Sequence, residues 1–240
     1  MPPFTQGQIV VFGGGGFAVE PQNRLLDEYV LRITGRRHPR VCFLPTASGD
    51  AQAWIDAFYA AFPEEACEPT HLSLFSRRVD DLLGFLLEQD LVYVGGGNTV
   101  NLLAVWRAQG LADVLDAALA EGVVFAGVSA GALCWFERGI TDSYGPGLNP
   151  MEIGLGVLEG AFCPHYDSDP RRPESYRRYI AAAGAPGWAV DDGVALHYVD
   201  GRLERLVSSR PNARAYRYTP AAGGEVEVET VEPIYLGGRE

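Results

Sequence analysis

The sequence predicts an α/β fold, a three-layer sandwich in which helices cover both faces of a mostly parallel central sheet. Short apolar strands alternate with helical segments from residue 8 to residue 136, which is the pattern of parallel strands joined by right-handed crossovers. Glycine-rich turns follow three of these strands, at 13–16, 95–97 and 127–131. From Trp188 onward the apolar residues alternate with period two, which predicts extra C-terminal β-strands.

The individual elements are expected at regular intervals along the chain. The dipeptide Asp200-Gly201 between two alternating segments predicts a hairpin. We find no internal repeat, linker or boundary, so residues 1–240 are expected to form a single domain. The expected strands are 8–12, 41–44, 70–74, 91–94, 123–126, 157–163, 194–199 and 202–207, with one or two more in 225–235, and the expected helices are 21–33, 52–62, 80–88, from 100, 111–120, from 131 to the loop at 141, and from 168 to 184.

The chain carries 31 acidic side chains against 19 basic ones, a formal net charge of −12. Such a charge disfavours a nucleic-acid backbone or an anionic membrane as partner. No apolar run approaches the length of a membrane span, and the N-terminal segment has no basic start. The four cysteines show no metal-like pairing, and three lie in apolar runs typical of free buried thiols. We therefore expect a cytoplasmic protein without a metal.

The segment Val123–Phe136 has the order strand, sharp turn, helix, and its turn reads Gly127-Val128-Ser129-Ala130-Gly131. This is the G-x-S-x-G pattern of a nucleophile elbow, in the context that such an elbow requires. The serine hydroxyl would project from the sheet, and the glycines would let neighbouring backbone come close. The amide of Ala130 would then point to the oxyanion of a reacting carbonyl. A tight strand–helix turn without chemistry is the alternative.

The other two glycine turns resemble cofactor-binding motifs, but each lacks a residue that its motif requires. Gly13, Gly15 and Ala18 fit G-x-G-x-x-A, but the next strand ends in Pro-Thr-Ala-Ser, without the acidic residue that holds a ribose. The turn Gly95–Thr99 could be a phosphate nest at a helix start, but it lacks the lysine of a P-loop. We therefore expect no cofactor. Gly97 is instead the expected second oxyanion donor, with Gly96 as the next candidate.

A serine nucleophile needs a general base within hydrogen-bond reach and a carboxylate that orients this base. Of the four histidines, His165 follows an apolar strand at the edge to which the elbow points, so we take it as the base. His38 lies in a basic turn, His71 opens a strand, and His197 lies in the middle of a hairpin strand. The positions of these three favour structural roles.

The orienting acid has two candidates. Asp142 lies in the loop after the nucleophile helix and could fold back beside His165. Glu137 would lie two turns along that helix, roughly 12 Å from Ser129 by helical rise, which is long for a partner one imidazole away. We favour Asp142 and keep Glu137 as the alternative.

Four segments taken together resemble the peptidase E family of serine peptidases (S51). The resemblance covers about residues 8–200 and implies a fold similar to the class I glutamine amidotransferases, with serine in place of their elbow cysteine. It implies Ser129 as nucleophile, His165 as base and Gly97 with Ala130 as the oxyanion hole, while the acid of the family varies in type and position. The four segments are YVGGGNT at 93–99, GVSAGALCWFE at 127–137, TDS at 141–143 and CPHYD at 163–167.

The resemblance also implies a small peptide as substrate, because the family includes aspartyl dipeptidases and cyanophycinases. Its glycine-turn motif places Asn98 and Thr99 at the substrate. Arg171 and Arg172 follow the base closely and could hold a substrate carboxylate in a guanidinium fork, which motivates Asp-X dipeptides as a hypothesis. Similar proteins commonly pair, so a homodimer is an open expectation.

Two other functions stay open. An α/β-hydrolase esterase shares the elbow pattern and would use His197 with Asp191 or Asp192, although these residues lie on the same hairpin. A non-catalytic module that binds amino acids or peptides would keep the pocket without the chemistry.

Overall fold

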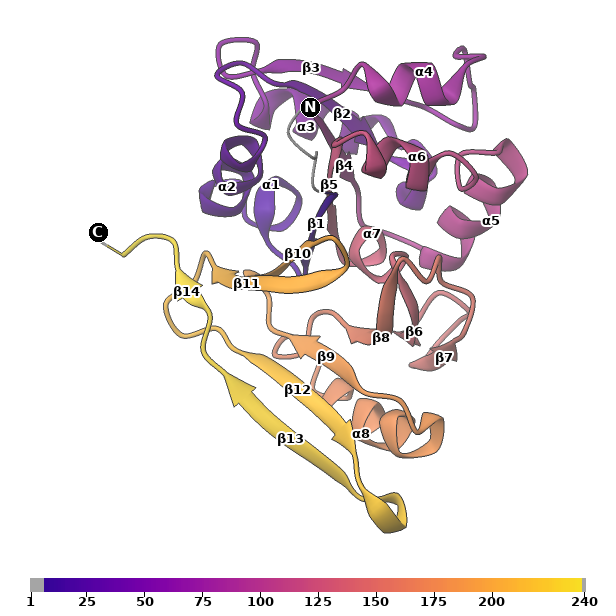
Figure 1. The fold of residues 1–240 in the computed structure, drawn as a ribbon, viewed down its shortest axis with the longest axis vertical. Helices are drawn as coiled ribbons and strands as arrows, with labels where there is room; N and C mark the ends of the chain where they lie inside the picture. Colours follow the sequence, from indigo (N-terminus) through magenta and orange to yellow (C-terminus); the bar gives the residue numbers. More distant parts are fainter. Residues whose placement is uncertain (1–6, 239–240) are drawn as a thin grey trace.

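The protein is described by a computed structural model that covers residues 7–238. Its larger sheet has eight strands, and the five at its centre and one edge run parallel to each other (Figure 1). From edge to edge the strands are β14 (Ile234–Tyr235), β11 (Arg202–Ser208), β10 (Val194–Val199), β1 (Gln8–Phe12), β5 (Val124–Val128), β4 (Leu91–Val94), β2 (Arg40–Leu44) and β3 (Glu68–His71). The predicted α/β class with a mostly parallel central sheet is confirmed.

Helices cover both faces of the larger sheet. Apolar side chains of the first three helices pack on one face and those of the next four on the other, since residues along each buried strand point alternately to the two faces. The first group comprises α1 (Gly16–Val19), α2 (Leu25–Ile33) and α3 (Gln52–Ala61), and the second comprises α4 (Leu82–Leu87), α5 (Thr99–Gln109), α6 (Leu115–Ala120) and α7 (Ala130–Leu133). A short 3₁₀ turn, η1 (Thr46–Ser48), follows β2.

A second sheet of six strands lies beside the helices of that second face (Figure 1). At its centre β8, α8 and β9 form a βαβ unit, because β8 and β9 pair in parallel. In order across the sheet the strands are β13 (Val226–Val231), β12 (Ala215–Pro220), β9 (Gly187–Val190), β8 (Leu158–Cys163), β6 (Phe136–Thr141) and β7 (Asn149–Met151), with α8 spanning Arg172–Ala183 and the turn η2 spanning Ala222–Gly224.

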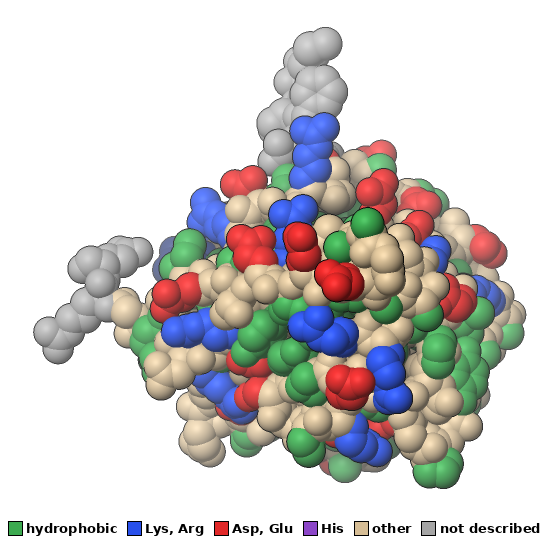
Figure 2. All heavy atoms as spheres, turned by 90° about the horizontal axis from the view of Figure 1, so that it is seen from below, with side chains coloured by type: hydrophobic (Ala, Val, Ile, Leu, Met, Phe, Trp, Pro, Cys, Tyr) green, Lys and Arg blue, Asp and Glu red, His purple; other side chains and the backbone are tan. Residues whose placement is uncertain are grey.

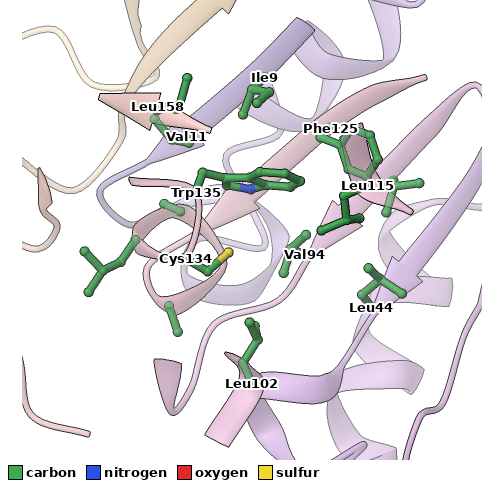
Figure 3. Packing of buried hydrophobic residues seen from close by; sticks show 14 of the residues in the cluster. Ile9, Val11, Leu44, Val94, Leu102, Leu115, Phe125, Cys134, Trp135 and Leu158 are labelled. Atoms are coloured by element: carbon green, nitrogen blue, oxygen red, sulfur yellow. The ribbon is translucent and has the colours of Figure 1, made fainter. Parts of the chain in front are cut away.

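The indole of Trp135 lies where the two sheets meet. It is fully buried, and its ring packs edge-on against Phe125 of the larger sheet at a centroid distance of 5.0 Å. Figure 3 shows Val11 of β1 and Leu158 of β8 on one side of the same ring, and Val94 of β4 on the other. One hydrophobic cluster thus contains residues of both sheets, which holds the sheets in a fixed relation.

The C-terminal half differs from the expectation in one important respect. The predicted hairpin is present, with Asp200 and Gly201 both at positive φ as its two turn residues. The helix expected from 131 to 141, however, ends after one turn at Leu133, and the chain continues as strand β6. The extra strands are therefore divided: β10, β11 and β14 extend the larger sheet, whereas β12 and β13 belong to the second one.

The surface carries charges of both signs. All 19 basic side chains of the sequence are arginines. Figure 2, a view from the second-sheet end of the molecule, shows them interspersed with carboxylates and apolar side chains. Within residues 7–238, no helix combines the length and apolar character that crossing a bilayer would require.

Candidate active site

Ser129 lies at the tip of a strained turn between β5 and α7. Its φ of 55° and ψ of −111° are values that non-glycine residues rarely adopt. A Cβ atom at Gly127 would lie 1.9 Å from the Gly131 carbonyl oxygen, and one at Gly131 would lie 2.3 Å from the Val94 carbonyl oxygen. Both glycines of the G-x-S-x-G pattern are thus required by backbone packing. The Ser129 N–H donates to the Phe12 carbonyl at 3.1 Å and fixes the turn on β1.

The structure brings His165 to this serine. His165 follows β8, also has a positive φ of 55°, and donates its backbone N–H to the Gly13 carbonyl at 3.2 Å. Its Nε2 lies 2.8 Å from Ser129 Oγ. The first glycine turn of the chain therefore serves as a backbone support for the imidazole.

A third side chain completes the arrangement, and it is Asp192. Its Oδ1 lies 2.6 Å from His165 Nδ1, which favours the tautomer with the proton on Nδ1 and leaves Nε2 to accept from the serine hydroxyl. A Cβ at Gly14 would lie only 2.0 Å from that same Oδ1 and 2.9 Å from Nδ1. A glycine at position 14 is therefore needed to seat the histidine–aspartate pair.

The two neighbouring aspartates titrate differently. Burial raises the pKa of Asp192, but the hydrogen bond and charge of His165, the hydrogen bond from Ser168 and the charge of Arg210 outweigh it, so the net shift is downward. For Asp191 burial prevails and raises the pKa to about 6. Asp192 is thus the ionised partner of the imidazole at neutral pH.

Neither acid expected from the sequence reaches the imidazole. Glu137 lies in strand β6 instead of a helix, and its Oε2 accepts the backbone N–H of Gly160 at 3.0 Å. Asp142 is exposed in the following loop. The charge of Asp142 acts on Arg171: the pKa of this arginine is raised mainly by Asp169, with a smaller contribution from Asp142. The expected geometry was wrong because α7 is a single turn, which sends the chain from the elbow directly into the second sheet.

A sequence signal for Asp192 did exist. Because β8 and β9 are parallel neighbours, the residues that follow them share one edge of the second sheet. His165 follows β8 and Asp192 follows β9, in the tripeptide Asp191-Asp192-Gly193. The carboxyl-edge rule that indicated Ser129 and His165 would also have indicated this aspartate, had the segment after Trp188 been assigned as a parallel strand.

The glycine turn after β4 lies against the serine. A Cβ at Gly96 would be 3.4 Å from the Ser129 Cβ, and Gly97 has a φ of 139° that favours glycine. Asn98 caps α5 through its Oδ1 and donates its Nδ2 to the Ser143 carbonyl. The Thr99 N–H donates to Ser143 Oγ at 2.9 Å. Asn98 and Thr99 therefore tie this turn to the loop at 141–143, and their contact with substrate stays a prediction.

The two candidate arginines share one carboxylate. Arg171 forms a fork with Asp169, with nitrogen–oxygen distances of 2.9 and 2.7 Å, which lowers the pKa of Asp169 to about 2. Arg172 is buried, with its Nε 3.8 Å from the same carboxylate and its Nη1 4.0 Å from Cys163 Sγ. Only Arg171, with 59% of its side chain exposed, is accessible to a ligand.

His197 is separate from this arrangement. It is buried, its Nδ1 lies 2.7 Å from the Tyr29 hydroxyl, and its Nε2 lies 3.1 Å from the side-chain oxygen of Gln8. Burial lowers its pKa to about 4, so the ring is neutral. An esterase centre built on His197 does not match this geometry. Among residues 7–238 no three histidine, cysteine, aspartate or glutamate side chains are grouped to hold a metal ion.

Comparison with known proteins agrees with the geometry. Residues 9–206 match the description Peptidase family S51. The chain belongs to this family of serine peptidases. It is 52% identical to the Uncharacterized peptidase YgaJ of Bacillus subtilis (strain 168) over 232 residues, which are 96% of this chain and 99% of the relative.

Two further proteins resemble the chain at lower identity. Peptidase E of Streptomyces coelicolor is 28% identical over 187 residues, 74% of each chain. The crystal structure of a peptidase from an acI-B1 Actinobacterium superposes with a TM-score of 0.66 at 16% identity, and the match covers 95% of this chain and 98% of that one. The structural match shows that the fold is shared.

Proposed function

We propose that this S51 peptidase is a serine exopeptidase of the dipeptidase type that hydrolyses short peptides through an acyl-enzyme on Ser129. The observation that carries the proposal is the continuous chain of contacts from Ser129 Oγ to His165 Nε2 at 2.8 Å and from His165 Nδ1 to Asp192 Oδ1 at 2.6 Å. A nucleophile, a base and an orienting carboxylate in hydrogen-bond contact are the arrangement that acyl transfer needs.

In this mechanism Ser129 Oγ attacks the peptide carbonyl while His165 Nε2 takes its proton. The imidazolium is stabilised by the ionised Asp192 and then delivers the proton to the leaving amine. Water, activated by the same imidazole, hydrolyses the acyl-enzyme.

The oxyanion would be held by the amides of Ala130 and Gly97, with Gly96 as the alternative to Gly97. The other amides of the glycine turn already have acceptors: Gly95 donates to Leu44, Asn98 to Ala47 and Thr99 to Ser143. Each such donor contributes about 3 kcal/mol of transition-state stabilisation.

The Asp-X hypothesis now depends on Arg171. Two of its donors bind Asp169, and the guanidinium has five N–H groups, so it can also bind a substrate carboxylate. If Arg171 has that role, the enzyme hydrolyses Asp-Leu faster than Ala-Leu, and Arg171→Gln removes the difference. Equal rates for the two dipeptides in the wild type would end the hypothesis.

The function is tested by incubating the protein with a panel of dipeptides and tripeptides and identifying the products by mass. We expect release of single residues or dipeptides from one end. Ser129→Ala should lower kcat/KM by at least about a thousandfold, with an unchanged melting temperature. Retained turnover in this variant would exclude the mechanism.

The same variant separates the peptidase from a binding module. A protein that only binds peptides would show no turnover in the wild type and the same peptide affinity with and without the serine hydroxyl. The homodimer and the cytoplasmic location stay predictions, which size-exclusion chromatography with light scattering and cell fractionation can test.

A further inference from the structure

Carboxylates crowd the region around Asp192. Besides the bond to His165, the backbone N–H of Asp192 donates to Asp167 Oδ1 at 2.8 Å. Asp191 is buried beside it, with one oxygen bonded to the Arg214 N–H at 2.8 Å. Like charges at such short range destabilise each other and favour protonation, so the ionised state of Asp192 needs a compensating positive charge.

Arg210 supplies part of that charge, in addition to His165. Its Nε and Nη2 contact Glu20 Oε1 at 2.6 and 2.5 Å, and its Nη1 lies 3.5 Å from Asp167 Oδ2. Since Asp167 also holds the Asp192 N–H, a continuous chain of contacts runs from Glu20 through Arg210 and Asp167 to Asp192. These residues follow α1, β11, β8 and β9 respectively, so the guanidinium joins segments of both sheets.

Contacts within the chain fix the position of Arg210. Ser208 Oγ accepts the Arg210 N–H at 3.0 Å and donates to its carbonyl at 2.6 Å. The Ser209 N–H donates to the Gly193 carbonyl at 2.8 Å. A Cβ at Gly193 would lie 2.8 Å from Arg210 Cγ, so the arginine stem packs directly on the residue that follows Asp192.

Each segment packed around Asp192 contributes polar or charged groups that face it. His165, Asp167 and Ser168 come from the loop after β8, Asp191 from its own loop, and Arg210 from the end of β11. Arg210 also lowers the pKa of Asp191 against the effect of burial. Loss of this one guanidinium would leave the carboxylates of Glu20 and Asp167 without the ion pairs that the structure shows.

We propose that Arg210 is a positioning residue of the active site, which holds Asp167, and through it the Asp192 main chain, and balances the charge of this acidic loop. The inference rests on the proposed catalytic role of the Ser129–His165–Asp192 arrangement. The proposal predicts in which direction the protonation of the histidine–aspartate pair changes, and a purely structural role of Arg210 would predict no such change. Removal of the positive charge makes protonation of the histidine–aspartate pair easier, whereas removal of the Asp167 charge makes it harder.

The experiment compares Arg210→Met, Arg210→Lys and Asp167→Asn with Arg214→Met as the matched control. Arg214 pairs with Glu232 and has a similar exposure, 30% of its side chain against 34% for Arg210. The readouts are the pH profile of kcat/KM with Ala-Leu and Asp-Leu, and NMR titration of His165 in protein labelled at histidine ¹³Cε1. The NMR signal does not depend on turnover.

For Arg210→Met we expect the acid limb of the kcat/KM profile and the midpoint of the NMR titration to move up by about one pH unit. For Asp167→Asn we expect both to move down by about half a unit. Arg210→Lys should restore the midpoint but not the full kcat, because an ammonium lacks the fork. Arg214→Met should leave both readouts unchanged. Unmoved midpoints, or shifts of the same sign in Arg210→Met and Asp167→Asn, would overturn the proposal.

If Arg210→Met does not fold, Asp167→Asn decides alone: a lower midpoint supports the proposal and an unchanged one overturns it. If no peptide is cleaved, or Ser129→Ala stays active, the proposed function fails, while the NMR midpoints still decide whether Arg210 controls the charge of the pair.

Discussion

The two sheets position their parts of the proposed active site by different means. The larger sheet fixes Ser129 through backbone: two glycines pack against carbonyl oxygens, and the Ser129 N–H bonds to β1. The second sheet supplies His165 and Asp192 from loops, and polar side chains hold the aspartate. We therefore expect the position of Ser129 to be sensitive to added volume, and that of Asp192 to be sensitive to charge.

The largest effect on kcat should come from a substitution in the part of the site that the second sheet supplies. Asp192→Asn keeps the shape of the side chain but removes the charge that stabilises the imidazolium and selects its tautomer. We expect kcat to fall by about 10³- to 10⁴-fold, measured by dipeptide hydrolysis. Asp142→Asn and Glu137→Gln are the controls and should stay within about twofold of the wild type. A large loss in either control would restore that residue as the acid.

A smaller loss of activity is expected from a substitution at Gly14, where the larger sheet contacts the residues supplied by the second sheet. Gly14→Ala puts a methyl group 2.0 Å from Asp192 Oδ1, so the aspartate or the turn must move. A misplacement near 1 Å costs about a hundredfold in rate, and we expect that loss in kcat/KM. Gly238→Ala is the control, because its methyl would meet only an ordinary contact at 3.4 Å. Full activity in Gly14→Ala would show that the pair tolerates movement.

In helix α2, which packs on the larger sheet, a buried charge should affect stability and leave catalysis unchanged. Asp27 is fully buried; burial raises its pKa to about 6, against the opposing effects of Arg24 and the Phe17 N–H. A raised pKa means that its stabilising contribution is complete below the unfolded value near 4 and is lost as the pH rises through about 6.

We therefore expect the unfolding free energy of the wild type, relative to Asp27→Asn, to fall by about 3 kcal/mol between pH 3 and pH 7. Urea unfolding at a series of pH values measures this difference. Dipeptide hydrolysis should differ by less than about twofold. A pH-independent difference would show that Asp27 has the same pKa in the folded and unfolded chains.

The fold was predictable where the signal was local. Apolar strands, helical periodicity and the turn Asp200-Gly201 each act within a few residues, and these elements appear in the structure. The serine turn was recognisable for the same reason. What the sequence did not reveal was the pairing of β8 with β9, whose paired residues are 26 positions apart. That pairing determines which carboxylate meets His165.

The length of α7 was the other error with a physical cause. Residues 130–140 are apolar enough for a buried helix or a buried strand, and periodicity alone does not distinguish them. Tertiary packing decides in favour of a strand, because Phe136 stacks on Phe162 of β8 at a centroid distance of 4.7 Å. Glu137 is thereby turned away from the serine.

The burial of every cysteine gives the protein a practical use as a labelling scaffold. Cys42, Cys67, Cys134 and Cys163 are all buried, and burial raises the pKa of each thiol, to about 11 for Cys67 and about 12 for Cys163. Alkylating reagents act on accessible thiolates. A Ser129→Cys variant would therefore carry one reactive sulfur beside an imidazole, and counting the iodoacetamide it consumes would report how many molecules in a preparation have an intact centre.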